Sequence, residues 1–121
     1  MPKLLIVDDE EDIREFAKSF FKKRGIEVFT AENGKEALGI VDEKSPDLLL
    51  LDITMDGLSG VDVLKTLRER ENPVKVIMVT GIEDQEIVNQ VKSFGVLNYV
   101  HKPLVLEELE KIVLKELTVL K

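Results

Sequence analysis

The chain has 121 residues, 44% hydrophobic and 34% charged, a composition typical of one folded domain and not of a disordered or membrane-embedded chain. Its 24 acidic residues exceed its 17 basic ones, and the net charge of −7 disfavours nucleic acid and anionic lipid as main partners. The absence of cysteine excludes disulfides and thiolate metal sites. We therefore expect residues 1–121 to form one domain without a second, output domain.

Short apolar runs alternate with amphipathic segments along the whole chain. The runs predict strands at 3–7, 27–31, 47–52, 74–79 and 97–101. The first run is too short for a signal peptide or a membrane span, so we expect a cytoplasmic protein. The third and fourth runs are continuously apolar over 48–51 and 76–79, as is typical of strands buried on both faces of a parallel sheet.

The segments between the runs have helical spacing. In the first, Ile13, Phe16, Ala17 and Phe20 recur at i, i+3, i+4 and i+7, and Gly25 ends the helix after three basic residues. We expect further helices at 34–43, 61–70 and 84–94, and a last one from about residue 104 to the C-terminus. The last helix has a wide apolar arc, which fits either edge packing or a partner or dimer surface.

Five strands alternating with five helices predict an α/β fold, a parallel sheet covered by helices on both faces. In such open sheets, ligands bind beyond the carboxyl ends of the strands. Polar residues stand at the carboxyl ends of four of the predicted strands, namely Asp8, Asp9 and Glu10, then Asp52, then Thr80, then Lys102. Any one acid could simply cap a helix, but capping does not explain all four strand ends together. Asp52 in particular ends the most apolar stretch, where a lone charge needs a partner or a metal.

Clustered carboxylates favour a divalent cation, because the cation makes all of them stable as anions. Mg²⁺ fits better than Ca²⁺, since it needs only one or two carboxylates, keeps several waters and often binds a phosphate oxygen. A lysine and a hydroxyl beside the acids supply the charge and the donor that a phosphoryl group needs. The sequence therefore predicts magnesium-dependent phosphoryl transfer onto a carboxylate.

The segments 5–10, 50–55 with Gly60, 79–81 and 99–103, in their order and spacing, resemble the receiver domains of two-component response regulators. The resemblance covers essentially the whole chain, and the chain is similar to single-domain regulators of the chemotaxis type. It implies a flavodoxin-like, doubly wound sheet of five parallel strands in the order 2-1-3-4-5 with five helices. The chain departs from the family pattern at Asp56, where proline is usual, and at Ile82, where polar residues are frequent.

The resemblance also implies a role for each candidate residue. Asp52 would be the phosphoacceptor and a magnesium ligand, Asp9 a direct ligand, Asp8 a ligand directly or through water, and the Thr54 carbonyl a backbone ligand.

On the opposite side of the site, Thr80 and Lys102 would hold the phosphoryl oxygens. Thr80 and Tyr99 would form the switch, and Lys102-Pro103 would be a cis peptide. His101, the only histidine, is expected on a strand position that points away from the site.

The same resemblance implies a histidine kinase or histidine phosphotransfer protein as the phosphodonor. It also implies a downstream protein partner, which could use the last helix and strand 97–101. Such a protein catalyses its own phosphorylation and slow dephosphorylation and is not an enzyme with independent turnover.

Three alternatives compete with this interpretation. A phosphatase of the haloacid dehalogenase type needs a second Asp two residues after the nucleophile, and that position is Thr54. A flavodoxin would have to bind the flavin phosphate at the first loop, where Asp8, Asp9 and Glu10 would repel it. A receiver-like module that binds partners without phosphorylation would not need the complete set of acids, threonine and lysine.

Overall fold

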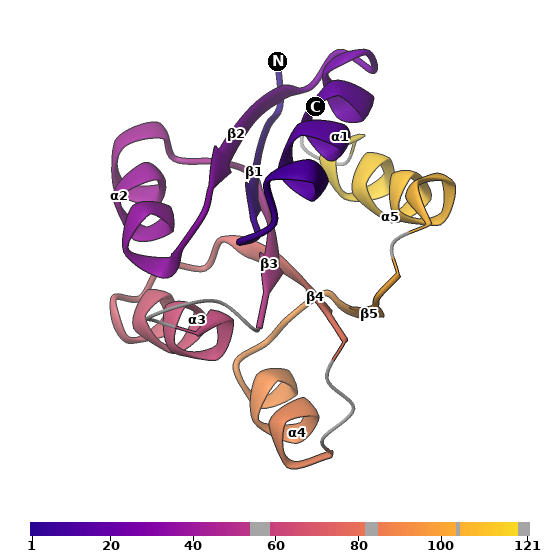
Figure 1. Cartoon of the computed structure of the whole chain (residues 1–121). Helices are drawn as coiled ribbons and strands as arrows, with labels where there is room; N and C mark the ends of the chain where they lie inside the picture. The colour runs from indigo at the N-terminus through magenta and orange to yellow at the C-terminus, as the bar shows by residue number, and fades with distance from the viewer. Residues whose placement is uncertain (54–58, 82–84, 104, 119–121) are drawn as a thin grey trace.

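The computed structural model describes residues 1–53, 59–81, 85–103 and 105–118, in which strands and helices alternate along the chain (Figure 1). The predicted elements are present, with boundaries that agree or are shifted by one or two residues, and the predicted C-terminal end of the last helix lies outside the described residues. The strands are β1 (Lys3–Val7), β2 (Glu27–Ala31), β3 (Leu48–Asp52), β4 (Lys75–Thr80) and β5 (Asn98–His101). The helices are α1 (Glu11–Lys22), α2 (Gly34–Lys44), α3 (Gly60–Glu69), α4 (Gln85–Ser93) and α5 (Leu106–Thr118).

The five strands form one parallel sheet in the order β2-β1-β3-β4-β5, which confirms the predicted fold class. β3 lies in the centre of the sheet, and all of its residues are buried. Asp52, at its end, is in register with Val79 of β4, and Thr80 is in register with His101 of β5. Because all strands run in the same direction, their carboxyl ends meet at one edge of the sheet.

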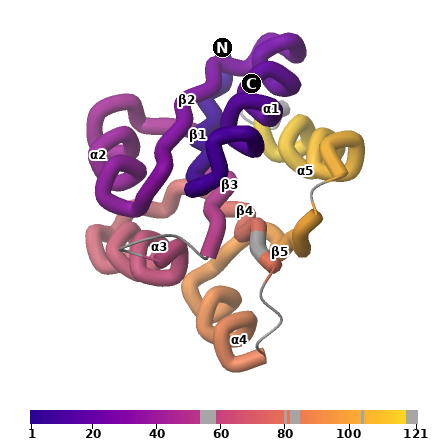
Figure 2. Tube along the Cα trace, viewed as in Figure 1, coloured from indigo at the N-terminus to yellow at the C-terminus, as the bar shows by residue number. Residues whose placement is uncertain are grey.

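Helices cover both faces of this sheet (Figures 1 and 2). α1 and α5 pack on one face, where Phe21 and Leu109 contact the core cluster that contains Leu50 of β3. α2, α3 and α4 lie on the other face, where the buried cluster includes Leu64 and Val91. Each large apolar side chain that is fully buried in these layers contributes about 1.5–3 kcal/mol. None of the described helices is long and apolar enough to cross a membrane.

The buried face of α1 differs from the face that the spacing suggested. Ala17 and Phe21 are the buried residues of this helix, whereas Phe16 is 68% exposed. Phe20 is half-buried, and its ring meets the ring of Phe21 edge-on at a centroid distance of 5.1 Å. Since Phe16 lies about 100° around the helix from Ala17, a face centred on Ala17 and Phe21 leaves it in solvent.

Most of the wide apolar arc of α5 serves packing. Its buried residues are Leu106, Leu109, Val113 and Leu117, and Ile112 and Leu114 are partly buried against the same core cluster. Val105, just before the helix, is 47% exposed. Within residues 105–118 the arc therefore fits an edge helix better than a large free surface.

Candidate functional site

Asp8 directly follows β1 and is only 3% exposed. Its backbone N–H donates to the carbonyl of Ala31, its Oδ1 accepts the N–H of Glu10 at 2.9 Å, and Arg14 donates to its carbonyl at 2.8 Å. The N-cap residue of α1 is Glu10, and no side chain caps this helix end. Asp8 therefore organises the loop after β1 instead of capping α1, which removes the simplest structural explanation for this acid.

Lys102 joins the ends of three strands. It follows β5, and its Nζ lies 3.0 Å from Oδ2 of Asp52, at the end of β3, and 3.1 Å from Oδ2 of Asp8, after β1. The same Nζ is 3.6 Å from Oε1 of Glu10. Asp52 is 3% exposed, so the Lys102 ammonium offsets the cost of burying its carboxylate.

The carboxylates also determine the charge state of Lys102. Burial lowers the pKa of this amine, but the hydrogen bonds and charges of Asp52 and Asp8 outweigh that effect and raise the pKa above its ordinary value. Lys102 therefore stays protonated at neutral pH. Asp9 belongs to the same acidic loop, so the carboxylates of Asp8, Asp9, Glu10 and Asp52 outnumber the nearby cations Lys102 and Arg14, and this excess of negative charge favours a further cation.

Three of these acids form a group with the spacing of a metal site. Asp8, Asp9 and Glu10 each offer a carboxylate oxygen, and these oxygens lie within 4.8 Å of one another. Hard oxygen donors on a partly solvated loop fit Mg²⁺, which retains several waters when bound. Glu10 was not among the predicted ligands, although it belongs to the same acidic run. Asp52 is linked to this group through Lys102.

The predicted switch residues lie on the neighbouring strands. Thr80 ends β4, one residue beyond Val79, the partner of Asp52, but its side chain lies outside the described part of the structure. Tyr99 is half-buried on β5, with its ring 5.3 Å from that of His101. His101 is exposed, and the Lys102-Pro103 bond is cis, as the resemblance implied.

Thr54, Asp56 and Ile82 lie outside the described residues, as do Leu104 and Leu120.

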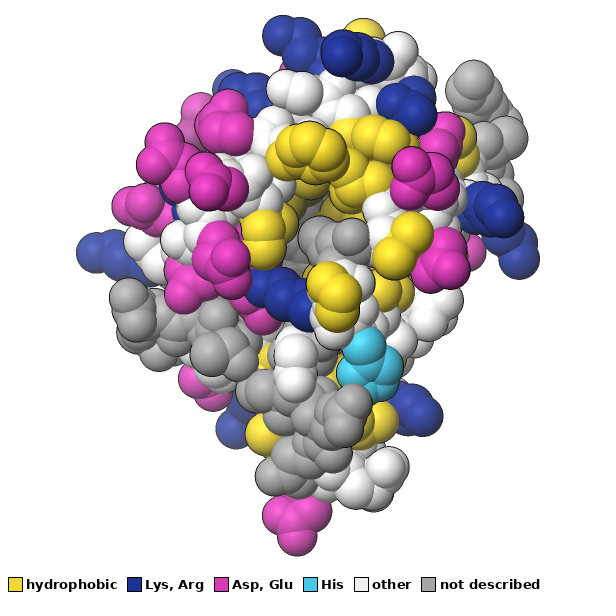
Figure 3. Space-filling model, turned by 45° about the vertical axis from the view of Figure 1, so that its right-hand side comes forward, with side chains coloured by type: hydrophobic (Ala, Val, Ile, Leu, Met, Phe, Trp, Pro, Cys, Tyr) yellow, Lys and Arg dark blue, Asp and Glu magenta, His cyan; other side chains and the backbone are white. Residues whose placement is uncertain are grey.

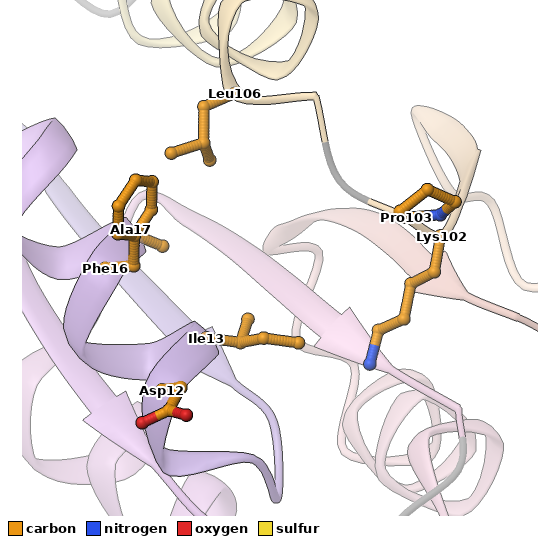
Figure 4. A pocket seen from close by; sticks show the side chains of 7 residues that line it. All are labelled: Asp12, Ile13, Phe16, Ala17, Lys102, Pro103 and Leu106. Atoms are coloured by element: carbon orange, nitrogen blue, oxygen red, sulfur yellow. The ribbon is translucent and has the colours of Figure 1, made fainter.

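An apolar pocket of about 360 Å³ adjoins the site (Figure 4). Its lining residues are Asp12, Ile13, Phe16 and Ala17 of α1, Leu106 of α5, and Lys102 and Pro103. On the face drawn in Figure 3, hydrophobic side chains surround a hollow, and acidic side chains lie nearby. The sequence analysis missed this pocket, because it depends on Phe16 facing solvent beside the start of α5.

In a comparison with protein families, residues 4–114 match the response regulator receiver domain. Sporulation initiation phosphotransferase F of Bacillus subtilis is 36% identical over 115 residues, which cover 95% of this chain and 93% of that protein. Chemotaxis protein CheY of Listeria monocytogenes is 39% identical over 116 residues, which cover 92% of this chain and 98% of that protein. Other relatives are longer, and the matched region spans 25% of regulatory protein AtoC of Escherichia coli.

Solved structures of similar fold lead to the same family. The receiver domain of a Francisella response regulator matches with a TM-score of 0.92 and 30% identity, and the match covers 100% of both chains. Response regulator TrrA from Thermotoga maritima, in complex with Mg(2+)-BeF, matches with a TM-score of 0.84 and 37% identity over 97% of this chain and 100% of that one.

Proposed function

Because the chain belongs to the family of response regulator receiver domains, we propose that residues 1–121 form a receiver domain that accepts a phosphoryl group on Asp52. The donor is a histidine kinase or a histidine phosphotransfer protein, the reaction depends on Mg²⁺, and the phosphorylated form signals by binding another protein. The observation that carries this proposal is the buried Asp52 carboxylate, held 3.0 Å from the Lys102 ammonium beside the acids that follow β1.

Asp52 is the nucleophile in the proposed transfer. One of its carboxylate oxygens attacks the phosphorus of the phosphohistidine, a P–O bond forms, the P–N bond breaks, and its electron pair returns to the imidazole nitrogen. Lys102 already lies within hydrogen-bond distance of Oδ2, so its ammonium can follow a phosphoryl group added there and neutralise its oxygens. Thr80, at the end of the adjacent strand, would donate its hydroxyl to the same group.

The acids Asp8, Asp9 and Glu10, together with Asp52 and the Thr54 carbonyl, would hold the magnesium ion. When bound, Mg²⁺ supplies positive charge to the phosphoryl oxygens during transfer. Before binding, Asp8 and Asp52 share the Lys102 ammonium, whereas Asp9 is exposed. Binding of the cation should therefore stabilise the Asp9 carboxylate more than the other two.

We place the phosphodonor over the pocket between α1 and α5. Lys102 lines both the pocket and the phosphoryl site, so a protein seated there is next to Asp52. The exposed Phe16 offers an apolar anchor on this surface. The acidic side chains of α1, such as Glu11 and Asp12, favour a donor with basic residues around its apolar contact.

Phosphorylation would act on the downstream partner through Thr80, at the end of β4, and Tyr99, on the neighbouring strand β5. β5 and α5 are the elements that would carry this change to the partner. The protein catalyses its own phosphorylation and slow dephosphorylation and does not turn over an independent substrate.

Intact-mass analysis after incubation with acetyl phosphate and Mg²⁺ tests the proposed acceptor. The parent protein should gain the mass of one phosphoryl group, and Asp52→Asn should gain none. Asp42→Asn removes an exposed acid of α2 that is remote from the site, and it should behave as the parent does. Uptake by Asp52→Asn at the parent rate would contradict the assignment, and steady turnover of p-nitrophenyl phosphate by the parent would favour the phosphatase alternative.

Thermal unfolding with and without Mg²⁺ tests the metal site independently of phosphorylation. At ten times its dissociation constant, a ligand that binds only the native state stabilises it by about 1.4 kcal/mol, which corresponds to a few degrees in melting temperature. Asp9→Asn should raise the melting temperature of the metal-free protein by relieving charge repulsion, and should lose the response to Mg²⁺. A full Mg²⁺ response in this variant would exclude Asp9 as a ligand.

A further inference from the structure

α3 begins directly against the backbone of Asp52. Gly60, its first residue, is buried, and its N–H donates to the carbonyl of Ile53 at 2.9 Å. A Cβ atom at this position would overlap the carbonyl oxygen of Asp52, and would lie 2.7 Å from the carbonyl carbon of Asp52 and 2.9 Å from the Cα of Ile53. All three are backbone atoms, so no side-chain rotation can relieve the overlap.

The start of α3 cannot easily retreat from this contact. Ser59 and Asp62 form a capping box, in which the Asp62 N–H donates to Oγ of Ser59 at 3.2 Å and the Ser59 N–H donates to Oδ2 of Asp62 at 3.3 Å. Further along the helix, Val63, Leu64 and Leu67 are packed in the core. The helix is therefore fixed at its first turn and along its buried face.

The central part of β3 is equally fixed, because Leu51 is in register with Val7 on one side and with Met78 on the other. Asp52 has a strand partner only in β4, and Ile53 follows the end of the strand. A methyl group at position 60 would therefore displace mainly Asp52 and Ile53. This displacement would change the position of the Asp52 carboxylate relative to the Lys102 ammonium.

We infer that Gly60 is a positioning residue for phosphoryl uptake, because only a residue without a side chain lets α3 hold the backbone of the acceptor Asp52 in place. The inference rests on the proposed function, since it concerns the same reaction. It also extends to the metal, because Ile53 is covalently followed by Thr54, whose carbonyl is a proposed ligand. Gly60 touches neither the phosphoryl group nor the cation, and it acts through Asp52 and Ile53.

A matched pair of glycine substitutions tests the inference. Gly39 lies inside α2, where an added Cβ would have nothing within 4 Å, so Gly39→Ala makes the same chemical change without the overlap. We expect Gly60→Ala to lower the rate constant of uptake from acetyl phosphate about 100-fold, the size of effect that a misplacement of 1 Å can cause. Gly39→Ala should keep the parent rate and raise the melting temperature.

The rate constant must be separated from loss of folded protein. Each variant is assayed well below its own melting temperature, so that the measured constant belongs to folded molecules. Leu67→Ala serves as a destabilised control in the same helix, since it leaves a cavity in the core but adds no atom near Asp52. It should melt at a lower temperature and keep the parent rate constant.

If Gly60→Ala alone does not fold, the same comparison is made with Ser45→Gly and Glu71→Gly added to every variant. Both residues have a positive φ, of 48° and 59°, so glycine relieves strain there. A parent rate in Gly60→Ala would overturn the inference, as would a loss of rate in Leu67→Ala as large as that in Gly60→Ala. Uptake by Asp52→Asn at the parent rate would instead refute the proposed function.

Discussion

Arg68, at the amino edge of the sheet, and Lys102, at its carboxyl edge, are held in different ways. At the amino edge, Arg68 of α3 donates to backbone carbonyls in the segments that precede β4 and β5, with bonds of 2.7 Å to Phe94 and 3.0 Å to Val74. Asp47, before β3, accepts the backbone N–H of Lys3 at 2.8 Å. At the carboxyl edge, by contrast, the bonds of Lys102 that join the strand ends are to carboxylates.

The partners of Arg68 serve the stability of the fold, whereas the carboxylates around Lys102 can take part in chemistry. A backbone carbonyl cannot leave its place without unfolding its segment, so Arg68 has partners that the fold fixes. A carboxylate can exchange an ammonium for a metal ion or gain a phosphoryl group while the backbone stays in place. The carboxyl edge can therefore change its charge and its partners in the folded protein, as a phosphoacceptor requires.

Removal of Lys102 should have the largest effect, because both uptake and stability depend on it. Lys102→Met removes the cation beside Asp52, and we expect uptake from acetyl phosphate to fall about 100-fold or more. It also leaves Asp8 and Asp52 buried without their ammonium, at a cost of about 3 kcal/mol in the free energy of unfolding. Intact-mass kinetics and urea unfolding measure the two effects, and Lys65→Met, at an exposed position of α3, is the control.

The stabilisation by Lys102 should also have a defined pH dependence. Folding raises the pKa of this amine, so the stabilisation is fully present below the unfolded pKa and is lost as the pH rises through the folded value. The difference in unfolding free energy between parent and Lys102→Met should be constant from about pH 7 to 9 and shrink above about pH 10.5. A difference that grows in alkaline solution would contradict the ion-pair assignment.

Removal of Arg68 should harm stability alone. Arg68→Met leaves the carbonyls of Asn72, Val74, Phe94 and Gly95 without their donor, and we expect a loss of about 3 kcal/mol in unfolding free energy. The uptake rate of folded molecules should not change. Arg70→Met, which breaks an exposed ion pair with Asp42, should cost little. If Arg68→Met slowed uptake as strongly as Lys102→Met, the distinction between the two edges would be wrong.

The pocket beside Lys102 provides a smaller and more selective test. Phe16→Ala should slow phosphotransfer from a protein donor about tenfold, the effect of losing one apolar anchor worth about 1.4 kcal/mol. It should not change uptake from acetyl phosphate, which does not need the pocket. Leu97→Ala, at a 42% exposed residue before β5, is the control at the amino edge. Equal rates with the protein donor for parent and Phe16→Ala would place the donor elsewhere.

The smallest expected effect is at Ser45, the C-cap of α2 near the amino edge. Its φ of 48° lies in the left-handed region, so Ser45→Gly should stabilise the protein by about 1 kcal/mol and leave uptake unchanged. Ser19→Gly, in the exposed face of α1, should instead destabilise by about 1 kcal/mol, because glycine costs entropy inside a helix. Thermal unfolding of the two variants should show opposite shifts, and shifts of the same sign would contradict the strain at Ser45.

The sheet could be predicted from the sequence, because the apolar runs that mark its strands are a local feature of the chain. The unbroken apolar run of β3 predicted burial on both faces, and Leu48, Leu49, Leu50 and Leu51 are all buried. The prediction that Asp8, Asp52 and Lys102 lie at one edge followed from the parallel sheet, whereas the strand order came from the resemblance to receiver domains. The face of α1 could not be assigned in the same way, since Phe16 and Phe21 both fit a helical period and only the packing of α1 against the sheet and α5 decides between them.

Contacts between segments that are distant in the sequence could not be predicted from the sequence. Arg68 has the pattern of a basic residue in the last turn of a helix, yet two of its carbonyl partners, Phe94 and Gly95, lie 26 and 27 residues away. Gly60 was recognised as part of a motif, but its overlap with the Asp52 backbone depends on how α3 returns to the sheet. Glu10 could have been included with the other acids, because it directly follows them.

Localisation of the phosphoryl group by peptide mapping tests the central claim most directly. Hydride reduction of an aspartyl phosphate gives homoserine, so the modified residue can be read from the fragment masses after treatment with acetyl phosphate, Mg²⁺ and borohydride. The account predicts homoserine at position 52, with Asp8 and Asp9 unchanged and no modification without Mg²⁺. Homoserine at Asp8 or Asp9, or an unmodified Asp52 in protein that has gained a phosphoryl group, would contradict it.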